Sequence, residues 1–158
     1  MILSSSSKYK ISQAVTRYPK PKSAILPALH VAYEEHGYLS DLMYEEIAEI
    51  IGVKFIEVAE AASFYTMFPK SKRGKYYIQV CRNISCALMG SHHLTSYLLE
   101  KLDIALGETT ADGMFTVVEA ECLGSCCTAP MMQVNETYHE NLTIEQVDRL
   151  IDELRTKK

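Results

Sequence analysis

The sequence lacks the motifs that most enzymes use to bind nucleotides or to activate a bond. Its seven glycines nowhere form G-x-G-x-x-G, so we do not expect this chain to bind NADH or a flavin by itself. G-x-S-x-G and H-E-x-x-H are also missing, which excludes two common hydrolase arrangements. These absences favour a binding or carrier protein over a self-contained enzyme.

Long apolar segments are missing as well. No stretch approaches the roughly 18 apolar residues of a membrane span. The segment Ser4–Lys8 is polar where a secretory signal would have its apolar region. We therefore expect no direct membrane insertion and a cytoplasmic location, where cysteines stay reduced.

The chain also lacks the positive charge of a nucleic-acid-binding protein, because its formal net charge is −4. Five basic residues and no acid lie within residues 1–22, and a second basic group occupies residues 70–75. We interpret these groups as a solvated tail and a linker. The alternative is that they dock onto an acidic partner.

A helix-turn-helix pattern in residues 44–65 is the main argument for DNA binding. Ala48, Gly52 and Val58 have the required spacing, but residues 41–65 hold six acidic residues and one lysine. The second helix, residues 55–65, has no cation to face phosphate. We therefore expect no nucleic-acid partner.

Five cysteines carry the strongest chemical signal in the sequence. Four form two close pairs, Cys81 with Cys86 (C-x4-C) and Cys122 with Cys126 (C-x3-C), and 35 residues separate the pairs. Each pair follows an apolar, β-branched run typical of a strand. The pattern predicts one inorganic site that receives thiolates from two loops at strand ends.

The spacing does not decide the metal or the fourth ligand. Thiolates hold both iron–sulfur clusters and zinc, and we favour iron–sulfur over a structural zinc module with four cysteine ligands. Cys126 and Cys127 are adjacent, so either could be the spare thiol. A thiol–disulfide enzyme is disfavoured because C-x-x-C is missing, and ligation by His92 and His93 is disfavoured because four thiols are already present.

Residues 1–72 are predicted to form a helical bundle. Apolar residues at helical spacing predict one helix after Pro21 that ends at Gly37, and a second from Ser40 or Asp41 to Gly52. A third helix is predicted over residues 55–64. Pro69 and the basic residues after it mark a linker to the second domain.

Residues 73–158 are predicted to form an α/β domain. Strands are expected at residues 75–80 and 114–120, with a helix at 94–102 between them. A hairpin at 130–139 that turns at Asn135-Glu136 and a helix at 143–154 complete the order. This is the order of thioredoxin-like folds.

Several segments resemble the thioredoxin-like [2Fe–2S] subunit of NADH:quinone oxidoreductase, the E-type subunit of bacterial respiratory complex I. The resemblance covers nearly the whole chain. It rests on residues 62–68, 80–90, 121–126, 129–130 and 138–143.

The resemblance implies one [2Fe–2S] cluster ligated by Cys81, Cys86, Cys122 and Cys126, with Cys127 left as a non-ligand. It implies that the cluster exchanges electrons with FMN, and that FMN and NADH belong to a partner flavoprotein subunit to which the helical bundle docks. A neighbouring iron–sulfur subunit and a position in the peripheral arm, at the inner face of the cell membrane, are further expectations. Cluster subunits of NAD-linked hydrogenases and formate dehydrogenases share the motif and stay open as alternatives.

We also expect backbone N–H groups of residues 83–87 and 123–125 to donate to sulfur. Arg82 is expected to add a positive charge that favours the reduced cluster.

Overall fold

The structure is a computed structural model that describes residues 2–157. It divides into two compact units, Met1–Lys72 and Arg73–Lys158, which we call the helical unit and the sheet unit. Each unit has a hydrophobic core of its own. None of the described helices is both long and apolar enough to cross a membrane.

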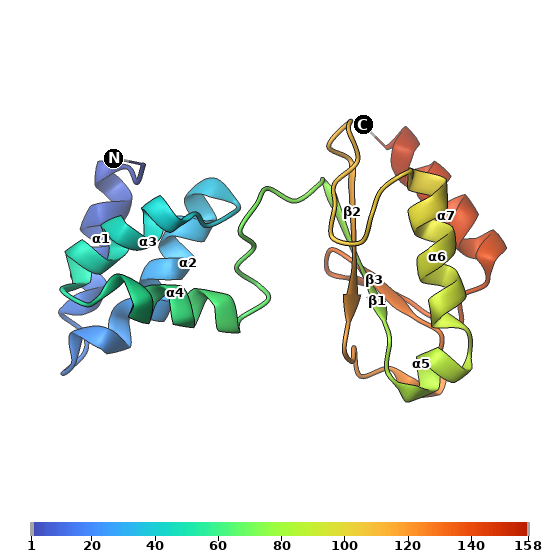
Figure 1. The fold of residues 1–158 in the computed structure, drawn as a ribbon, viewed down its shortest axis with the longest axis horizontal. Helices are drawn as coiled ribbons and strands as arrows, with labels where there is room; N and C mark the ends of the chain where they lie inside the picture. Colours follow the sequence, from blue (N-terminus) through green and yellow to red (C-terminus); the bar gives the residue numbers. More distant parts are fainter. Residues whose placement is uncertain (1, 158) are drawn as a thin grey trace. The chain divides into compact units, whose positions relative to one another are not determined.

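The helical unit consists of four α-helices and one short 3-10 helix (Figure 1). In chain order they are α1 (Ser5–Val15), η1 (Pro21–Ala24), α2 (Ile25–His36), α3 (Asp41–Ile51) and α4 (Phe55–Phe64).

Helix α1 lies where we predicted a solvated tail, and that prediction is wrong. The Ser4 hydroxyl caps the helix by accepting a hydrogen bond from the Ser7 N–H at 3.2 Å. Ile11 is fully buried and Ala14 nearly so. Two of the basic residues, Lys8 and Lys10, therefore lie on a helix that packs into the unit.

The other three helices agree with the sequence prediction. Helices α2 and α3 end at Gly37 and Gly52, whose φ angles of 73° and 78° are left-handed. Glycine adopts this conformation without a Cβ clash, so it ends a helix at little cost. Helix α4 occupies the ten residues predicted for it.

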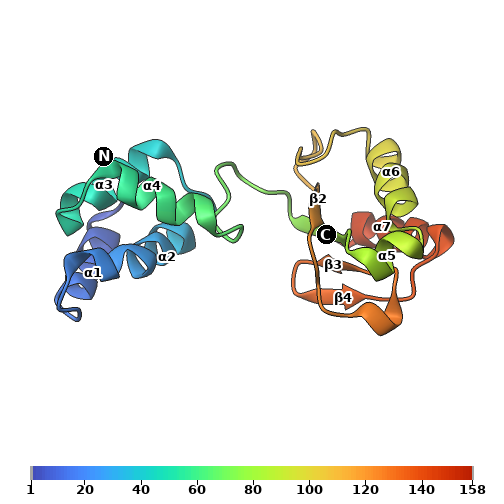
Figure 2. The same ribbon diagram turned by 60° about the horizontal axis from the view of Figure 1, so that its bottom comes forward.

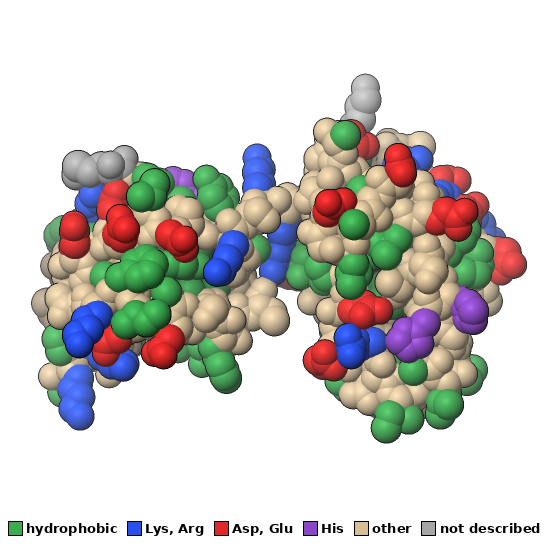
Figure 3. Space-filling view, in the orientation of Figure 1, with side chains coloured by type: hydrophobic (Ala, Val, Ile, Leu, Met, Phe, Trp, Pro, Cys, Tyr) green, Lys and Arg blue, Asp and Glu red, His purple; other side chains and the backbone are tan. Residues whose placement is uncertain are grey.

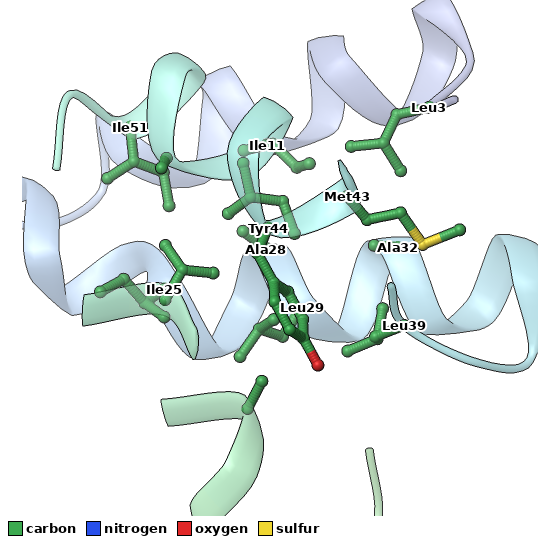
Figure 4. Packing of buried hydrophobic residues seen from close by; sticks show 14 of the residues in the cluster. Leu3, Ile11, Ile25, Ala28, Leu29, Ala32, Leu39, Met43, Tyr44 and Ile51 are labelled. Atoms are coloured by element: carbon green, nitrogen blue, oxygen red, sulfur yellow. The ribbon is translucent and has the colours of Figure 1, made fainter. Parts of the chain in front are cut away.

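The core of the helical unit is drawn in Figure 4. Leu29 from α2 and Met43 and Tyr44 from α3 are almost completely buried, and the Met43 side chain extends towards Ala32 of α2. Burial of each such side chain contributes roughly 1.5–3 kcal/mol. Phe68, beyond the last helix, joins the same core, and the Leu39 N–H donates to the Pro69 carbonyl at 2.8 Å. The segment after α4 is therefore fixed to the bundle as far as Pro69.

Replacing Glu46 with glutamine is expected to destabilise the helical unit by about 2 kcal/mol at neutral pH. The Glu46 carboxylate on α3 accepts hydrogen bonds from the N–H groups of Ile2 and Leu3 and pairs with Lys8 Nζ at 2.9 Å. Desolvation opposes its ionisation, but these partners outweigh desolvation and lower the pKa of Glu46 to about 2. Because the folded-state pKa is depressed, the stabilisation is complete above about pH 4.5 and is lost as the pH falls towards 2.

Denaturant titrations of the Glu46→Gln variant, followed by helical circular dichroism at several pH values, check this expectation. Glu49→Gln changes an exposed carboxylate on the same helix and serves as the control, with an expected effect within about 0.5 kcal/mol. Equal stability of the two variants at neutral pH would contradict the assigned role of Glu46.

The sheet unit is a four-stranded sheet with two long helices (Figures 1 and 2). Its elements are β1 (Tyr76–Cys81), α5 (Ile84–Leu88), α6 (Ser91–Leu102), β2 (Phe115–Ala120), η2 (Cys126–Thr128), β3 (Met132–Val134), β4 (Thr137–His139) and α7 (Ile144–Thr156).

The strand order is β2-β1-β3-β4. Strands β1 and β2 are parallel, with Ile78 opposite Val117, whereas β3 is antiparallel to both β1 and β4. A parallel pair needs a crossover connection, and α6 lies within it. The expected thioredoxin-like α/β order is thus present, and the hairpin turns at the predicted Asn135-Glu136.

Helices α6 and α7 lie on the same side of the sheet (Figure 1). Leu98 from α6 and Ile151 from α7 are fully buried in one core with Ile78 of β1 and Val117 of β2. Helix α7 begins with a capping box in which the Thr143 hydroxyl and the Gln146 side chain each accept a backbone hydrogen bond. This core fixes the positions of β1 and β2, whose carboxyl ends lie at the same edge of the sheet.

Candidate metal centre

The sheet brings the cysteine segments together. Strand β1 ends at Cys81, which is paired with Ala120, the last residue of β2. Because the strands are parallel, the chain leaves both of them at the same edge. Figures 1 and 2 show α5, which follows β1, at this edge.

The first cysteine pair is buried. Cys81 is 3% exposed and Cys86, on α5, is 2% exposed. They form a small separate core with Met131, packed against Leu123 and Ala129. Segments on both sides of the η2 turn therefore contact the first pair.

The second cysteine pair, Cys122 and Cys126, is exposed on the loop that joins β2 to η2. Gly124 lies between them with a φ of 80°, a conformation that strains other residues. Its N–H donates to Cys122 Sγ at 3.4 Å. The glycine thus lets the loop turn a backbone N–H towards sulfur, as expected for residues 123–125.

The surroundings of Cys81 favour its thiolate. Burial opposes ionisation, but N–H groups of Asn83 and Leu123 donate to the sulfur, and the thiols of Cys86 and Cys122 also hydrogen-bond to it. Together these hydrogen bonds outweigh desolvation and lower the pKa of Cys81. A thiolate is the form that ligates a metal.

The pKa of Cys86 moves in the opposite direction. Burial is the largest cause and raises the pKa of Cys86. The neighbouring Cys81 raises this pKa further by hydrogen bonding and by its charge, and so does the charge of Cys126. A hydrogen bond from the Met131 N–H has the opposite effect. Two adjacent thiols cannot both ionise easily without a compensating cation. The sulfurs that influence one another most are thus those of Cys81, Cys86, Cys122 and Cys126.

Cys127 follows Cys126 directly in the chain and lies beside this group. It is exposed, like Cys126, and both line a surface hollow of about 310 Å³. Exposure therefore does not distinguish the two adjacent cysteines. The charge of Cys126 acts on the Cys86 thiol, which favours Cys126 as the fourth ligand.

Two expectations about the surroundings of the thiols need correction. The N–H groups of Ile84 and Ala87 donate to Asn83, within α5, and not to sulfur. The Arg82 guanidinium forms two ion pairs. Its Nη1 atom lies 3.4 Å from Glu119 Oε2, and its Nε atom lies 3.7 Å from Glu121 Oε2. These two carboxylates offset the positive charge that we expected Arg82 to bring to the site.

The two histidines weighed as alternative ligands lie on the surface. His92 and His93 are exposed in the first turn of α6, and His30 packs edge-on against Phe68 in the other unit. Three groups that contact the cysteine segments were not predicted from the sequence. They are the Met131 N–H, which donates to Cys86, and the side chains of Tyr138 and Glu140, which hydrogen-bond to the cysteine loop. Tyr138 and Glu140 lie within a segment that carries the family resemblance, but nothing in their spacing indicates a contact with the cysteine loop.

The donor set fits a two-iron cluster. The thiols form two pairs, one buried and one exposed. A [2Fe–2S] cluster takes thiolates in pairs, two on each iron.

Four thiols and their N–H donors, gathered at one edge of a thioredoxin-like sheet, define an iron–sulfur protein of the ferredoxin class. Residues 11–155 match the family described as "Thioredoxin-like [2Fe-2S] ferredoxin". The chain belongs to this family, and the predictions of its fold and of a [2Fe–2S] cofactor are confirmed.

Two relatives are similar to this chain over more than four fifths of their own length. The chain is 46% identical to an E-type subunit, numbered 2, of the NADH-quinone oxidoreductase of Rhizobium meliloti, over 92% of this chain and 87% of that one. It is 41% identical to "NADH-quinone oxidoreductase subunit 2" of Thermus thermophilus over 94% of this chain and 83% of that one.

A solved structure of an NAD+-reducing [NiFe]-hydrogenase in the H2-reduced state is also similar. Its TM-score is 0.70 with 25% sequence identity, over 85% of this chain and 22% of that chain. The present chain thus spans about a fifth of the hydrogenase chain that it resembles.

Proposed function

We propose that this chain is an electron-transfer subunit of an NADH:quinone oxidoreductase of the complex I type. It carries one [2Fe–2S] cluster held by Cys81, Cys86, Cys122 and Cys126. The observation that carries the proposal is the meeting of these four thiols at one sheet edge. The names of the relatives support it.

When bound, the cluster supplies a centre that accepts and returns one electron. The chain provides four thiolates and the N–H groups of Asn83, Leu123, Gly124 and Met131. Hydrogen bonds to sulfur and solvent exposure set the reduction potential of such a centre. The buried Cys81 and Cys86 would hold the cluster away from water, and the exposed Cys122 and Cys126 would leave it accessible to a redox partner.

The relatives are named as subunits of an NADH-quinone oxidoreductase, and we propose the same setting for this chain. The partner that holds FMN and NADH is a flavoprotein subunit, with an iron–sulfur subunit nearby, in a peripheral arm at the inner face of the cell membrane. The surface beside the cluster supports a partner there. Ile84, Leu88 and Met89 are exposed, and Figure 3 shows apolar side chains protruding where Figure 1 draws α5. A group of exposed apolar side chains is typical of a surface that another protein covers.

A second candidate function is that of the cluster subunit of an NAD-linked hydrogenase or formate dehydrogenase. The structural likeness to the NAD+-reducing hydrogenase favours the hydrogenase form. The isolated chain cannot distinguish these parents, so the purified parent complex is to be assayed with quinone, hydrogen and formate.

The first test is the iron and acid-labile sulfide content of the anaerobically purified chain. We expect the amounts of one [2Fe–2S] cluster per chain and an electron paramagnetic resonance signal that appears only after reduction with dithionite. Zinc without sulfide would instead identify a structural interaction module and would overturn the electron-transfer function.

A further inference from the structure

The loop with Cys122 and Cys126 has one apolar side chain, Leu123, that packs against the small core around Cys81 and Cys86. Cys122 and Cys126 themselves are exposed, as are the neighbouring Glu121 and Cys127. Hydrogen bonds with β4 and the segment that follows it hold the loop as well.

Glu140, just after β4, accepts two of these hydrogen bonds. Its Oε1 atom accepts a hydrogen bond from Ser125 Oγ and another from Thr128 Oγ1, the latter at 2.6 Å. Ser125 precedes Cys126, and Thr128 ends the 3-10 turn that begins at Cys126. One carboxylate thus fixes the chain on both sides of this proposed ligand.

Neighbouring contacts reinforce the same attachment. Tyr138 Oη donates to the Leu123 carbonyl at 2.8 Å, between Cys122 and Gly124. The Asn141 N–H donates to the Thr128 carbonyl, also at 2.8 Å. Of these contacts, the one through Glu140 alone brings a negative charge.

On the basis of the proposed function, we propose that Glu140 is a positioning residue for the [2Fe–2S] cluster. It holds the Cys122–Cys126 loop through Ser125 and Thr128, which slows loss of the cluster. Its charge lowers the reduction potential of the cluster.

The two effects have separate physical causes. Hydrogen bonds to an ionised acceptor are roughly twice as strong as neutral ones. Removal of the Glu140 carboxylate therefore makes the loop more mobile, and Cys122 and Cys126 dissociate from the metal more often. A fixed negative charge near the cluster disfavours an added electron, because net charge is one of the determinants of potential. A glutamine at this position keeps an oxygen acceptor but removes the charge, so the two effects can be measured apart.

The test compares Glu140→Ala and Glu140→Gln in the full chain with its cluster. Loss of the visible absorbance in the presence of an iron chelator gives the rate of cluster loss, and a redox titration followed by electron paramagnetic resonance gives the potential. We expect Glu140→Ala to lose the cluster about tenfold faster than wild type and Glu140→Gln to stay within about twofold. Both variants are expected to have a higher potential than wild type.

The control is Glu136→Ala, which removes an exposed carboxylate in the β3–β4 turn and is expected to keep the wild-type rate and potential. If Glu140→Ala does not fold, Ser125→Ala removes one of the two donors and is expected to accelerate cluster loss by a smaller factor. A wild-type rate in Glu140→Ala or in its substitute Ser125→Ala, or an unchanged potential in Glu140→Gln, overturns the inference. If the wild-type protein contained no iron and sulfide, the proposed function itself would be wrong. The iron and sulfide assay detects this outcome separately.

Discussion

Replacing Cys86 with serine is expected to remove most of the iron and sulfide from the protein, whereas replacing Cys127 with serine is expected to leave both in place. Cys86 is buried on α5 in a small core with Cys81 and Met131. A serine there presents a hard, protonated oxygen where iron in such clusters requires a soft thiolate. Cys127 is exposed, and under the proposed function it is not a ligand.

The two variants are to be purified anaerobically and compared for iron, sulfide and the reduced-state electron paramagnetic resonance signal. Circular dichroism of each variant separates loss of the cluster from loss of the fold, because the main core of the sheet unit does not include Cys86. If the two variants lost iron equally, the assignment of Cys126 over Cys127 as the fourth ligand would be wrong. If Cys86→Ser kept a wild-type signal, the first pair would not be a pair of ligands.

Most of the fold could be predicted from local sequence signals. Helices α2 to α4 have apolar residues at helical spacing, and a capping glycine ends two of them. Helix α1 was missed because serine and lysine dominate its sequence and only three of its residues are buried. The Ser4 cap and the spacing of Ile11 and Ala14 are the signals that could have found it. Helix α5, with five residues, is too short to show any periodicity.

The sequence was sufficient to predict the proposed thiol ligands of the site, but not the residues that hydrogen-bond or pair with the cysteine segments. Paired cysteines after two predicted parallel strands were sufficient to place the thiols at one edge. The contacts of Tyr138 and Glu140 with the cysteine loop join residues 12 to 15 positions apart. The partners of Arg82 lie on or just after another strand. Such contacts depend on how strands and loops meet in space, which no local pattern encodes.

Removing residues 1–72 is expected to leave a fragment that keeps its cluster and no longer binds the flavoprotein partner. The core of the sheet unit and the small core around Cys81 and Cys86 contain only residues after Arg73, so the fragment keeps its own packing. Residues 1–72 contain no cysteine and therefore supply no thiolate to the cluster. Under the proposed function, their role is to dock this chain to its partner.

The helical unit has a surface suited to that role. Leu26, Phe64 and Tyr65 line a hollow of about 430 Å³ beside the Lys22–Glu57 ion pair, and Phe64 is 78% exposed. Exposed aromatic side chains of this kind are typical of the buried centres of protein interfaces. Phe64→Ser in the full chain is therefore expected to weaken partner binding by about tenfold or more.

Binding of the full chain, the 73–158 fragment and the Phe64→Ser variant to the purified flavoprotein subunit is to be measured by titration. Tyr9→Ser is the matched control, because Tyr9 is an equally large, exposed aromatic residue on α1 and does not line the hollow. Binding of the fragment at the affinity of the full chain would move the docking surface to the sheet unit, where exposed apolar residues of α5 border the cluster. Loss of iron from the fragment would instead show that the helical unit stabilises the cluster, since the cysteines of the fragment are unchanged.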